Sequence, residues 1–467
     1  MSFSPARPLV SIIIPTYNRS HLLSQTLASV LAQTYTPLEI IVVDDGSTDE
    51  TLTMLAQYEG RILLVTQANQ GVAAARNHGT RIAKGHYLTF LDDDDLIEPT
   101  KIARQVALFQ RQPELGLVHC GYYLSDKDGQ LRDKVWLWPQ ADTLRQLICR
   151  NFIWSGAPLI RRDSLQAVGE YDSQLTNGQD WDLWLKLALA GVPFAVIPQP
   201  LGTYRLQPDS MVTNLTRLQN AVLTVLERAF AHPALPESVA AIKPEAYGGT
   251  HLWLSGRGYA TGQWDIGQHH WQAAFQWRPE WQTQPGLLLP LWRNQALDIR
   301  VADPLSFVHH LFNHLPDEAG AFRPYKPQLL GQVQAELALR AYNQDKVKIG
   351  QHHWQQAVTL DPQTWTDPAA FIDLLLNHVM RLPHTDPPEW VEKVLHHWPL
   401  PAHARRKLRR LVLAKVHLAC AFESYALDDS PQTLYHLLAA IRYGPGCLRN
   451  RGVLSILLRS LKSRYAR

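Results

Sequence analysis

Short apolar runs alternate with amphipathic stretches between Val10 and Leu91. Val10–Ile14 is rich in β-branched residues and is followed by Pro15, a pattern typical of a buried parallel strand that the proline closes. A helix is predicted to begin at Asn18 or Ser20, because apolar residues then recur every three or four positions. The alternation continues, with strands predicted over Glu39–Val43, Arg61–Thr66 and His86–Leu91 and a helix over Val72–Ala83.

This order of elements predicts an α/β fold with a doubly wound, mostly parallel sheet. Ser47 and Glu50 have the spacing of a capping box that opens the helix after the second strand. Two acidic clusters, Asp44–Asp45 and Asp92–Asp95, follow predicted strand ends, where such sheets bind ligands. Four consecutive carboxylates are costly to place there for packing alone, so we expect a positive group beside Asp92–Asp95.

The pattern changes after about residue 213, where helical periodicity takes over. GQHHWQAAFQWRPEW at 267–281 recurs as GQHHWQQAVTLDPQTW from residue 350, a step of 83 residues. The same step relates tyrosines, alanines and prolines: Tyr259, Tyr342 and Tyr425; Ala274, Ala357 and Ala440; Pro279, Pro362 and Pro445. Each unit is predicted to contain a helix pair similar to a tetratricopeptide pair, with additional helices. Stacked units would form a helical array that binds a protein partner, self-associates or supports a binding site of the first domain.

The length of 467 residues predicts more than one domain, and we place them at 1–213 and 214–467, the second with three units. A net charge of +3 gives no indication of a nucleic-acid partner. Cys120, Cys149, Cys420 and Cys447 lack the spacing of a metal site or a disulfide framework. MSFSPARPLVSIII is interpreted as a first strand rather than a signal peptide, and no apolar run of about 18 residues occurs. These features are typical of a cytoplasmic protein, with peripheral contact at the inner face of a membrane as an alternative.

Four motifs, in order, carry a specific resemblance. SIIIPTYNR, VVDDGSTDET, NQGVAAARNHG and YLTFLDDDDLIEP resemble the nucleotide-sugar-binding half of family 2 glycosyltransferases with the GT-A fold. NGQDWDLWLKLALAG and LGTYRLQPDSM resemble the acceptor-side and closing-loop motifs, so the resemblance spans residues 8–213. It implies a metal-dependent, inverting transfer of a sugar from a nucleotide diphosphate sugar to a hydroxyl of a glycan, a lipid-linked saccharide or a protein.

A departing diphosphate gains negative charge, so the resemblance also implies a divalent cation, Mn²⁺ or Mg²⁺. Asp94 matches the likeliest direct metal ligand, and Asp92 is a second candidate. Asp92 or Asp93 would otherwise contact the ribose or a metal-bound water, and Asp95 either serves the acceptor side or has no assigned role. The alternative is that the run is an acidic surface turn.

The base and phosphate contacts are expected at the other motifs. Asp45 would accept the imide N–H of a pyrimidine base, which favours a UDP-sugar, or would only cap the turn before Gly46. Arg76 suits phosphate or ribose oxygens, unless it is an ordinary surface arginine. The remaining residues expected at the nucleotide sugar are Pro15, Thr16, Tyr17, Gln70 and, closing over the diphosphate, Arg205.

The predicted catalytic base is Asp180, which would remove the proton of the acceptor hydroxyl. Its alternative role is helix capping, and Asp182 is equally suited to cap a helix beginning there. The family often has an acid where this chain has Gln179, and a histidine where it has Gln207. Flat aromatic faces suit sugar rings, so tryptophans beside these motifs either line an acceptor pocket or lie in the core: Trp154, with Ser155, and Trp181 and Trp184.

Two basic stretches follow in the helical region. Arg405–Arg410 precedes an apolar helix, and RGVLSILLRSLKSRYAR at the C-terminus places five apolar residues on one predicted face: Val453, Leu454, Leu457, Leu458 and Leu461. This helix either rests on an anionic membrane or packs on the last repeat. For the whole chain, the alternatives to the transferase are a non-catalytic scaffold and a transferase that acts on a polyprenyl phosphate, which needs no base.

Overall fold

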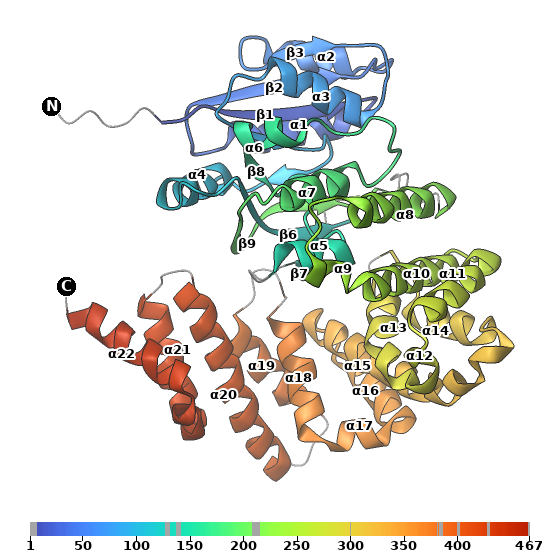
Figure 1. The fold of residues 1–467 in the computed structure, drawn as a ribbon. Helices are drawn as coiled ribbons and strands as arrows, with labels where there is room; N and C mark the ends of the chain where they lie inside the picture. The colour runs from blue at the N-terminus through green and yellow to red at the C-terminus, as the bar shows by residue number, and fades with distance from the viewer. Residues whose placement is uncertain are drawn as a thin grey trace. The chain divides into compact units, whose positions relative to one another are not determined.

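The structure is a computed structural model that describes residues 7–126, 131–136, 142–207, 215–298, 300–380, 382, 386–398, 402–426 and 430–465. It divides into two compact units, Met1–Glu280 and Trp281–Arg467 (Figure 1). Leu215 and Leu254, from the predicted helical domain, belong to the same hydrophobic core as Ile12 of the first strand. The compact units therefore divide later in the chain than the predicted boundary at residue 213, which was drawn from composition and resemblance.

The first unit contains one sheet with helices around it. Its strands are β1 (Val10–Thr16), β2 (Leu38–Asp44), β3 (Leu63–Thr66), β4 (Tyr87–Phe90), β5 (Leu96–Ile97), β6 (Leu117–Ser125), β7 (Leu131–Trp136), β8 (Leu159–Arg161) and β9 (Phe194–Arg205). Its helices are α1 (Ser20–Leu31), α2 (Thr51–Leu55), η1 (Ala56–Tyr58), α3 (Val72–Ile82), α4 (Lys101–Arg111), α5 (Thr143–Cys149), α6 (Arg162–Val168), α7 (Gln179–Leu189), α8 (Leu215–Ala231), α9 (Glu237–Ala240), α10 (Lys243–Ala260) and α11 (Trp264–Trp277), and α12 (Glu280–Thr283) crosses to the second unit.

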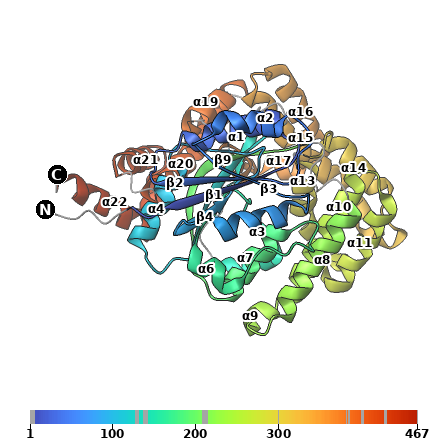
Figure 2. The same cartoon turned by 90° about the horizontal axis from the view of Figure 1, so that it is seen from above.

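The strand order is β3-β2-β1-β4-β8-β6-β9-β5, with β7 beside β6. The pairs β1–β2, β1–β4 and β2–β3 are parallel, and Figure 2 shows α1 and α2 on one side of these strands and α3 on the other. The predicted fold class is confirmed. The parallel register brings the carboxyl ends of β1, β2 and β4 to one edge, so the two acidic clusters that follow β2 and β4 lie at that edge.

Two local predictions in this region were wrong. β1 continues through Pro15 to Thr16, because β4 pairs with β1 only as far as Ile13 and the missing N–H of Pro15 lies beyond that pairing. The capping box is absent, since α2 begins at Thr51 and the Oδ1 atom of Asp49 accepts the Thr51 N–H at 2.9 Å. The Ser47 hydroxyl instead accepts a hydrogen bond from the backbone N–H of Asn18 at 2.9 Å.

In the second unit, the regular elements that the structure describes are all helices. It contains η3 (Pro285–Leu288), α13 (Leu289–Ala296), α14 (Pro304–Asn313), η4 (Asp317–Tyr325), α15 (Lys326–Asn343), α16 (Val347–Leu360), α17 (Pro362–Thr366), α18 (Pro368–Val379), α19 (Pro387–His397), α20 (Ala402–Ala426), α21 (Ser430–Tyr443), η5 (Pro445–Arg449) and α22 (Arg451–Tyr465). Within the described ranges, no helix is both long enough and apolar enough to cross a membrane.

The 83-residue step corresponds to three helix pairs, α10–α11, α15–α16 and α20–α21. The repeated alanines are fully buried in all three pairs. Each pair also has a polar contact between its two helices at the same repeat position: His251 with His270 at 2.9 Å, Gln334 with His353 at 2.6 Å, and His417 with His436 at 3.0 Å. The repeated histidines thus contribute to helix pairing, and the likeness to tetratricopeptide repeats stays a prediction.

Candidate active site

Asp45 lies at the end of β2 and holds the turn that precedes α3. Its Oδ1 atom accepts hydrogen bonds from the Gln67 side chain at 2.7 Å and from the backbone N–H of Gln70 at 2.9 Å. Its Oδ2 atom accepts the backbone N–H of Gly71 at 2.8 Å. A carboxylate that gathers three donors fixes the conformation of this turn. Asp45 therefore has a structural task beside the base contact that the sequence predicts for it.

The acidic run after β4 is held by contacts with distant elements. Asp93 accepts a hydrogen bond from the Thr16 hydroxyl at 2.6 Å. The hydroxyl of Thr26, on α1, lies 2.9 Å from the backbone carbonyl oxygens of both Asp93 and Asp95. These contacts anchor the run against β1 and α1. It is a fixed part of the fold, unlike the surface turn considered as an alternative.

Asp95 is fully buried and accepts hydrogen bonds from two residues, Trp154 and Arg205. Its carboxylate accepts the indole N–H of Trp154 at 2.6 Å and the backbone N–H of Arg205 at 2.9 Å. Burial raises the pKa of Asp95 well above its usual value, and the charges of Asp94 and Asp92 raise it further. The buried guanidinium of Arg205 donates to the carbonyl of Asp94 and to the side chain of Gln25. Asp95 and Arg205 thus join the run to the end of β9.

Asp94 differs from its neighbours because, within the described ranges, no hydrogen bond joins its carboxylate to another residue; its own backbone N–H bonds it. Burial raises its pKa to about 6, the charge of Asp92 adds to the increase, and Arg19 and Arg205 oppose it. Burial likewise raises the pKa of Asp93 to about 7. Carboxylate oxygen is the ligand type that Mg²⁺ and Mn²⁺ prefer. The donor set therefore fits a divalent cation at Asp94.

The carboxylates do not form a complete metal cage by themselves. Among the described residues, no group of three or more His, Cys, Asp or Glu side chains is arranged to hold a metal ion. A cation that is bound partly by substrate phosphates needs only one or two protein carboxylates. The arrangement suits a metal that arrives with a diphosphate.

Arg76 is buried and forms an ion pair with Asp92. The alternative that it is an ordinary surface arginine is therefore wrong. Its guanidinium lies 2.5 Å from the Oδ1 atom of Asp92, whose Oδ2 atom accepts the Ser155 hydroxyl at 2.9 Å. The guanidinium also lies 5.2 Å from the centre of the Tyr171 ring. Asp92 raises the pKa of Arg76 against the effect of burial, and Tyr171 adds to this. Arg76 is therefore a permanent cation at the site.

Asp180 lies in the first turn of α7. Its Oδ2 atom accepts the side-chain N–H of Asn151 at 2.9 Å, and its Oδ1 atom accepts the backbone N–H of Trp181 at 2.8 Å. Burial raises the pKa of Asp180, while Arg76 is the largest of the charges and hydrogen bonds that lower it. This carboxylate is electrostatically linked to the Arg76–Asp92 pair and has no direct ion pair with a residue that the structure describes. It is suited to accept a proton.

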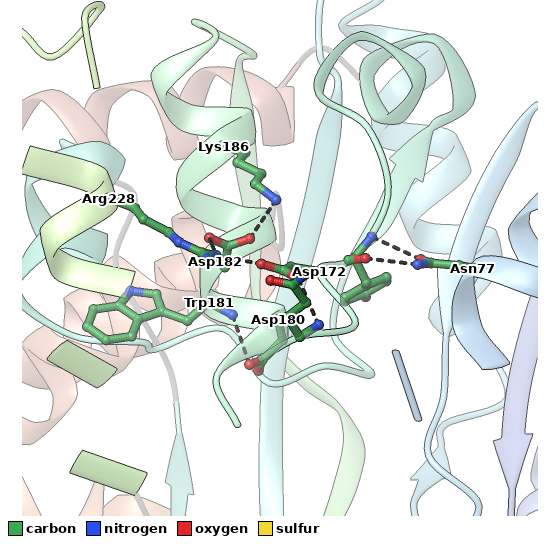
Figure 3. A network of polar contacts seen from close by, with 9 residues as sticks. Asn77, Asp172, Asp180, Trp181, Asp182, Lys186 and Arg228 are labelled. Carbon is green, nitrogen blue, oxygen red and sulfur yellow. Dashed lines mark hydrogen bonds and ion pairs between the residues drawn. The ribbon is translucent and has the colours of Figure 1, made fainter. Parts of the chain in front are cut away.

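Asp182 has a different environment two residues later (Figure 3). Its carboxylate pairs with Lys186 at 2.6 Å and lies 3.8 Å from Arg228 of α8, which also pairs with Asp172 at 2.6 Å. α7 begins at Gln179 with Gly178 as its N-cap, so Asp182 does not take the capping role for which the sequence made it a candidate. Asp182 thus pairs with cations of both α7 and α8, and its role is to bind α8 to α7.

Known proteins are similar to parts of this chain. Residues 11–169 match Glycosyl transferase family 2. The "Uncharacterized glycosyltransferase RT0329" of Rickettsia typhi is 32% identical over 255 residues, which are 53% of this chain and 78% of the relative. The "Putative teichuronic acid biosynthesis glycosyltransferase TuaG" of Bacillus subtilis is 33% identical over 212 residues, 44% of this chain and 83% of that protein. The chain belongs to glycosyltransferase family 2.

Solved structures are similar to this glycosyltransferase at lower sequence identity. S. aureus TarS 1-349 in complex with UDP-GlcNAc has a TM-score of 0.42 and 16% identity, and the match covers 76% of this chain and 91% of that chain. The mannosyltransferase PcManGT from Pyrobaculum calidifontis in complex with GDP-Man and Mn²⁺ has a TM-score of 0.43 and 18% identity, with 66% and 88% covered.

One of the two departures of this glycosyltransferase from the family pattern, Gln179, has a local explanation. Gln179 is buried, and its side-chain N–H donates to the carbonyl of Leu175 at 2.7 Å, a contact that a carboxylate could not make. Gln207 has a buried side-chain nitrogen without a hydrogen bond in the described chain. Residues 208–211 of the closing-loop motif lie outside the described residues. Gln179 therefore stabilises the approach to α7.

Three tryptophans expected near an acceptor are core residues. Trp154, Trp181 and Trp184 are all buried, and their indole N–H groups donate to Asp95 and to the backbone carbonyls of Leu147 and Ile153. Tyr17, by contrast, is exposed at the end of β1, next to buried Pro15 and Thr16. The structure thus brings the predicted donor residues to one edge of the sheet and removes the tryptophans from the candidate acceptor surface.

Two residues of the site were missed from the sequence. Asn151 orients Asp180 and belongs to no motif, so no signal pointed to it. Tyr171 stacks near Arg76 and is held by Asn77, whose side chain bonds both the N–H and the carbonyl of Tyr171 at 2.9 and 2.8 Å. Asn77 is part of the NQGVAAARNHG motif and could have been singled out there, but its partner follows only from the fold.

Proposed function

We propose that this glycosyltransferase transfers a sugar, with inversion, from a nucleoside diphosphate sugar to a hydroxyl acceptor and depends on Mn²⁺ or Mg²⁺. The observation that carries the proposal is the state of Asp94. The carboxylates of its three acidic neighbours are engaged by Arg76, Thr16 and Trp154, whereas no hydrogen bond joins the Asp94 carboxylate to another described residue. A carboxylate left open beside other carboxylates favours a cation.

The donor would lie along the carboxyl edge of β1, β2 and β4. Asp45 and the turn it fixes would face the base, with UDP favoured, and Pro15, Thr16 and Tyr17 would border it. Gln70 and Arg76 lie at the turn and in the helix that follow, where backbone N–H groups and a guanidinium attract phosphate and ribose oxygens. Asp92 and Asp94 are the candidate ligands of the metal, and Asp93 is the candidate for a ribose contact.

A bound divalent cation would supply positive charge to the diphosphate as its bond to the sugar breaks. The acceptor oxygen would attack the anomeric carbon from the opposite face, and its proton would pass to Asp180. Asn151 keeps the Asp180 carboxylate oriented, and Arg76 lies close enough to lower the pKa of that carboxyl. Arg205 keeps the acidic run in place from the end of β9.

The proposal is tested with a panel of nucleotide sugars, measuring Mn²⁺-dependent binding by calorimetry and release of nucleoside diphosphate. At least one donor is expected to bind and to be hydrolysed slowly, and Asp94→Asn is expected to remove the metal dependence. Asp163→Asn, which changes an exposed carboxylate on α6, is the matched control. If no donor binds, or if Asp94→Asn behaves like the wild type, the proposal is wrong.

A transferase acting on a polyprenyl phosphate is the second candidate, because an ionised acceptor needs no base. The position of Asp180 beside Arg76 favours the hydroxyl acceptor. Full transfer to a polyprenyl phosphate by Asp180→Asn would favour the second candidate.

A further inference from the structure

Positive charge is concentrated in the last repeat and the C-terminal helix. Residues 402–467 contain thirteen Lys or Arg and three Asp or Glu, a net charge of +10, whereas the whole chain has +3. The rest of the chain is therefore acidic overall. A charge asymmetry of this size indicates a segment that meets an anionic surface.

The C-terminal helix α22 has apolar side chains on two sides. Val453 and Ile456 are buried in a cluster with Ala421 of α20 and Leu437 of α21. Leu454 and Leu458, one turn apart, are 40% and 59% exposed. The single apolar face predicted from the sequence is thus divided between packing on the last repeat and solvent, and the side chain of Leu461 lies outside the described residues.

The neighbouring helix α21 carries a similar exposed stripe. Tyr435 and Leu438 are 60% and 54% exposed, and Arg442 follows on the same helical face. α21 packs against α22. On α22, Arg451 and Arg459 are exposed on either side of the two leucines, and Arg459 also donates to the Tyr425 hydroxyl at 3.0 Å.

We propose that α21 and α22 dock on an anionic phospholipid bilayer through a terminal basic surface, defined as Tyr435, Leu438, Arg442, Arg451, Leu454 and Leu458. Aliphatic and tyrosine side chains would enter the headgroup region, and the arginines would lie at the lipid phosphates. Phosphodiester groups of a nucleic acid would match the arginines but would give the leucines no apolar environment. A bilayer matches both. This inference goes beyond the proposed transfer reaction and does not depend on it.

The test uses the full-length protein and sedimentation with vesicles of phosphatidylcholine alone or with about 30% phosphatidylglycerol. Binding is expected with phosphatidylglycerol, to be at least about tenfold weaker without it, and to weaken in high salt. Leu454→Ser/Leu458→Ser is expected to weaken binding at least about tenfold. Arg442→Glu/Arg451→Glu is expected to weaken it by about fivefold or more for each charge changed.

Ile349→Ser is the matched control, because Ile349 is 50% exposed on α16, outside the terminal basic surface. It should bind vesicles like the wild type. Melting temperatures verify that each variant is folded, and Leu458→Ser alone replaces the double variant if that one is destabilised. The proposal is overturned if both kinds of vesicle bind equally, if a folded leucine variant binds like the wild type, or if Ile349→Ser weakens binding as much.

Binding to RNA, a polyanion without an apolar interior, tests whether the terminal basic surface binds a nucleic acid instead of a bilayer. If RNA binds as tightly as the anionic vesicles and the leucine variant binds both like the wild type, the surface recognises charge alone and the bilayer proposal is wrong. Weak RNA binding together with leucine-dependent vesicle binding supports it.

Discussion

Replacing Asp180 by asparagine should stop catalysis while leaving donor binding intact. Both Asp180 oxygens accept a hydrogen bond, one from Asn151 and one from the Trp181 backbone. The asparagine amide has one oxygen, which can accept one of these two hydrogen bonds, and one NH₂ group, which would face the other donor. About one hydrogen bond is therefore lost, which lowers the stability by roughly 1–2 kcal/mol. The loss of a general base lowers kcat by about 10²–10⁴-fold.

The assay is the release of nucleoside diphosphate from the donor identified in the panel, with water or the acceptor as the nucleophile. Calorimetry should give the same donor affinity for Asp180→Asn and the wild type, within about twofold, because the change alters the transition state rather than donor binding. Asp182→Asn breaks the ion pair with Lys186 and is the matched control. It should lower the melting temperature and keep kcat.

A swapped variant separates catalysis from structure. Asn151→Asp/Asp180→Asn restores a carboxylate–amide hydrogen bond with the two groups exchanged, so its stability should return toward that of the wild type. Its kcat should remain low, because the carboxylate has moved to position 151. Recovery of activity in the swapped variant, or a kcat for Asp180→Asn within about threefold of the wild type, would refute the role of Asp180 as the base.

Three further predictions concern other parts of the chain. Asp45→Asn should weaken nucleotide binding about tenfold or more, measured by calorimetry, because one of three donors loses its acceptor. Burial lowers the pKa of His251 and of His270 to about 4, so stability present at pH 7 should be lost between about pH 6.5 and 4, by up to roughly 3 kcal/mol for each histidine. His251→Gln, which copies the second repeat, should reduce this loss in acid melting curves and should not alter it if the pair does not titrate. Gly350→Ala places a Cβ 3.0 Å from the Tyr342 ring and should destabilise by about 1–2 kcal/mol; Gly320→Ala, with open space, should not, and equal melting temperatures would contradict the steric argument.

The parallel half of the sheet was predictable because its signal is local. Ile12, Ile13 and Ile14 are all buried, as a continuous apolar run in a parallel strand requires. The antiparallel pairing of β8 with β4 and β6 was not predicted, since β8 has only three residues and its partners are distant in sequence. The limit of the first compact unit was missed for a similar reason, because α8 and α10 are helical in pattern yet complete the core of the sheet domain.

The repeat shows where similarity of sequence stops predicting burial. Tyr259 and Tyr342 are buried and pack against Gly267 and Gly350, one helix away. In the third unit the position of the glycine is taken by Thr433, which is buried, and Tyr425 is 36% exposed. A side chain at that position occupies the space of the ring, so the third tyrosine turns toward α22 and accepts a hydrogen bond from Arg459.

The four consecutive residues after Leu91 are all aspartate, so the sequence does not distinguish them. Their environments differ because each carboxylate meets different partners from distant parts of the chain. Arg76 and Ser155 engage Asp92, Thr16 engages Asp93, and Trp154 engages Asp95. A local pattern cannot reveal such partners, because each belongs to a separate element of the fold. The consequence is experimental: Asp94→Asn removes charge without breaking a hydrogen bond to another described residue, and its remaining oxygen can still accept its own backbone N–H. Asp95→Asn instead leaves a buried indole or backbone N–H without its acceptor. Asp94→Asn should therefore preserve or raise the melting temperature without metal while abolishing Mn²⁺ dependence, and a melting temperature well below that of the wild type would show that Asp94 is structural.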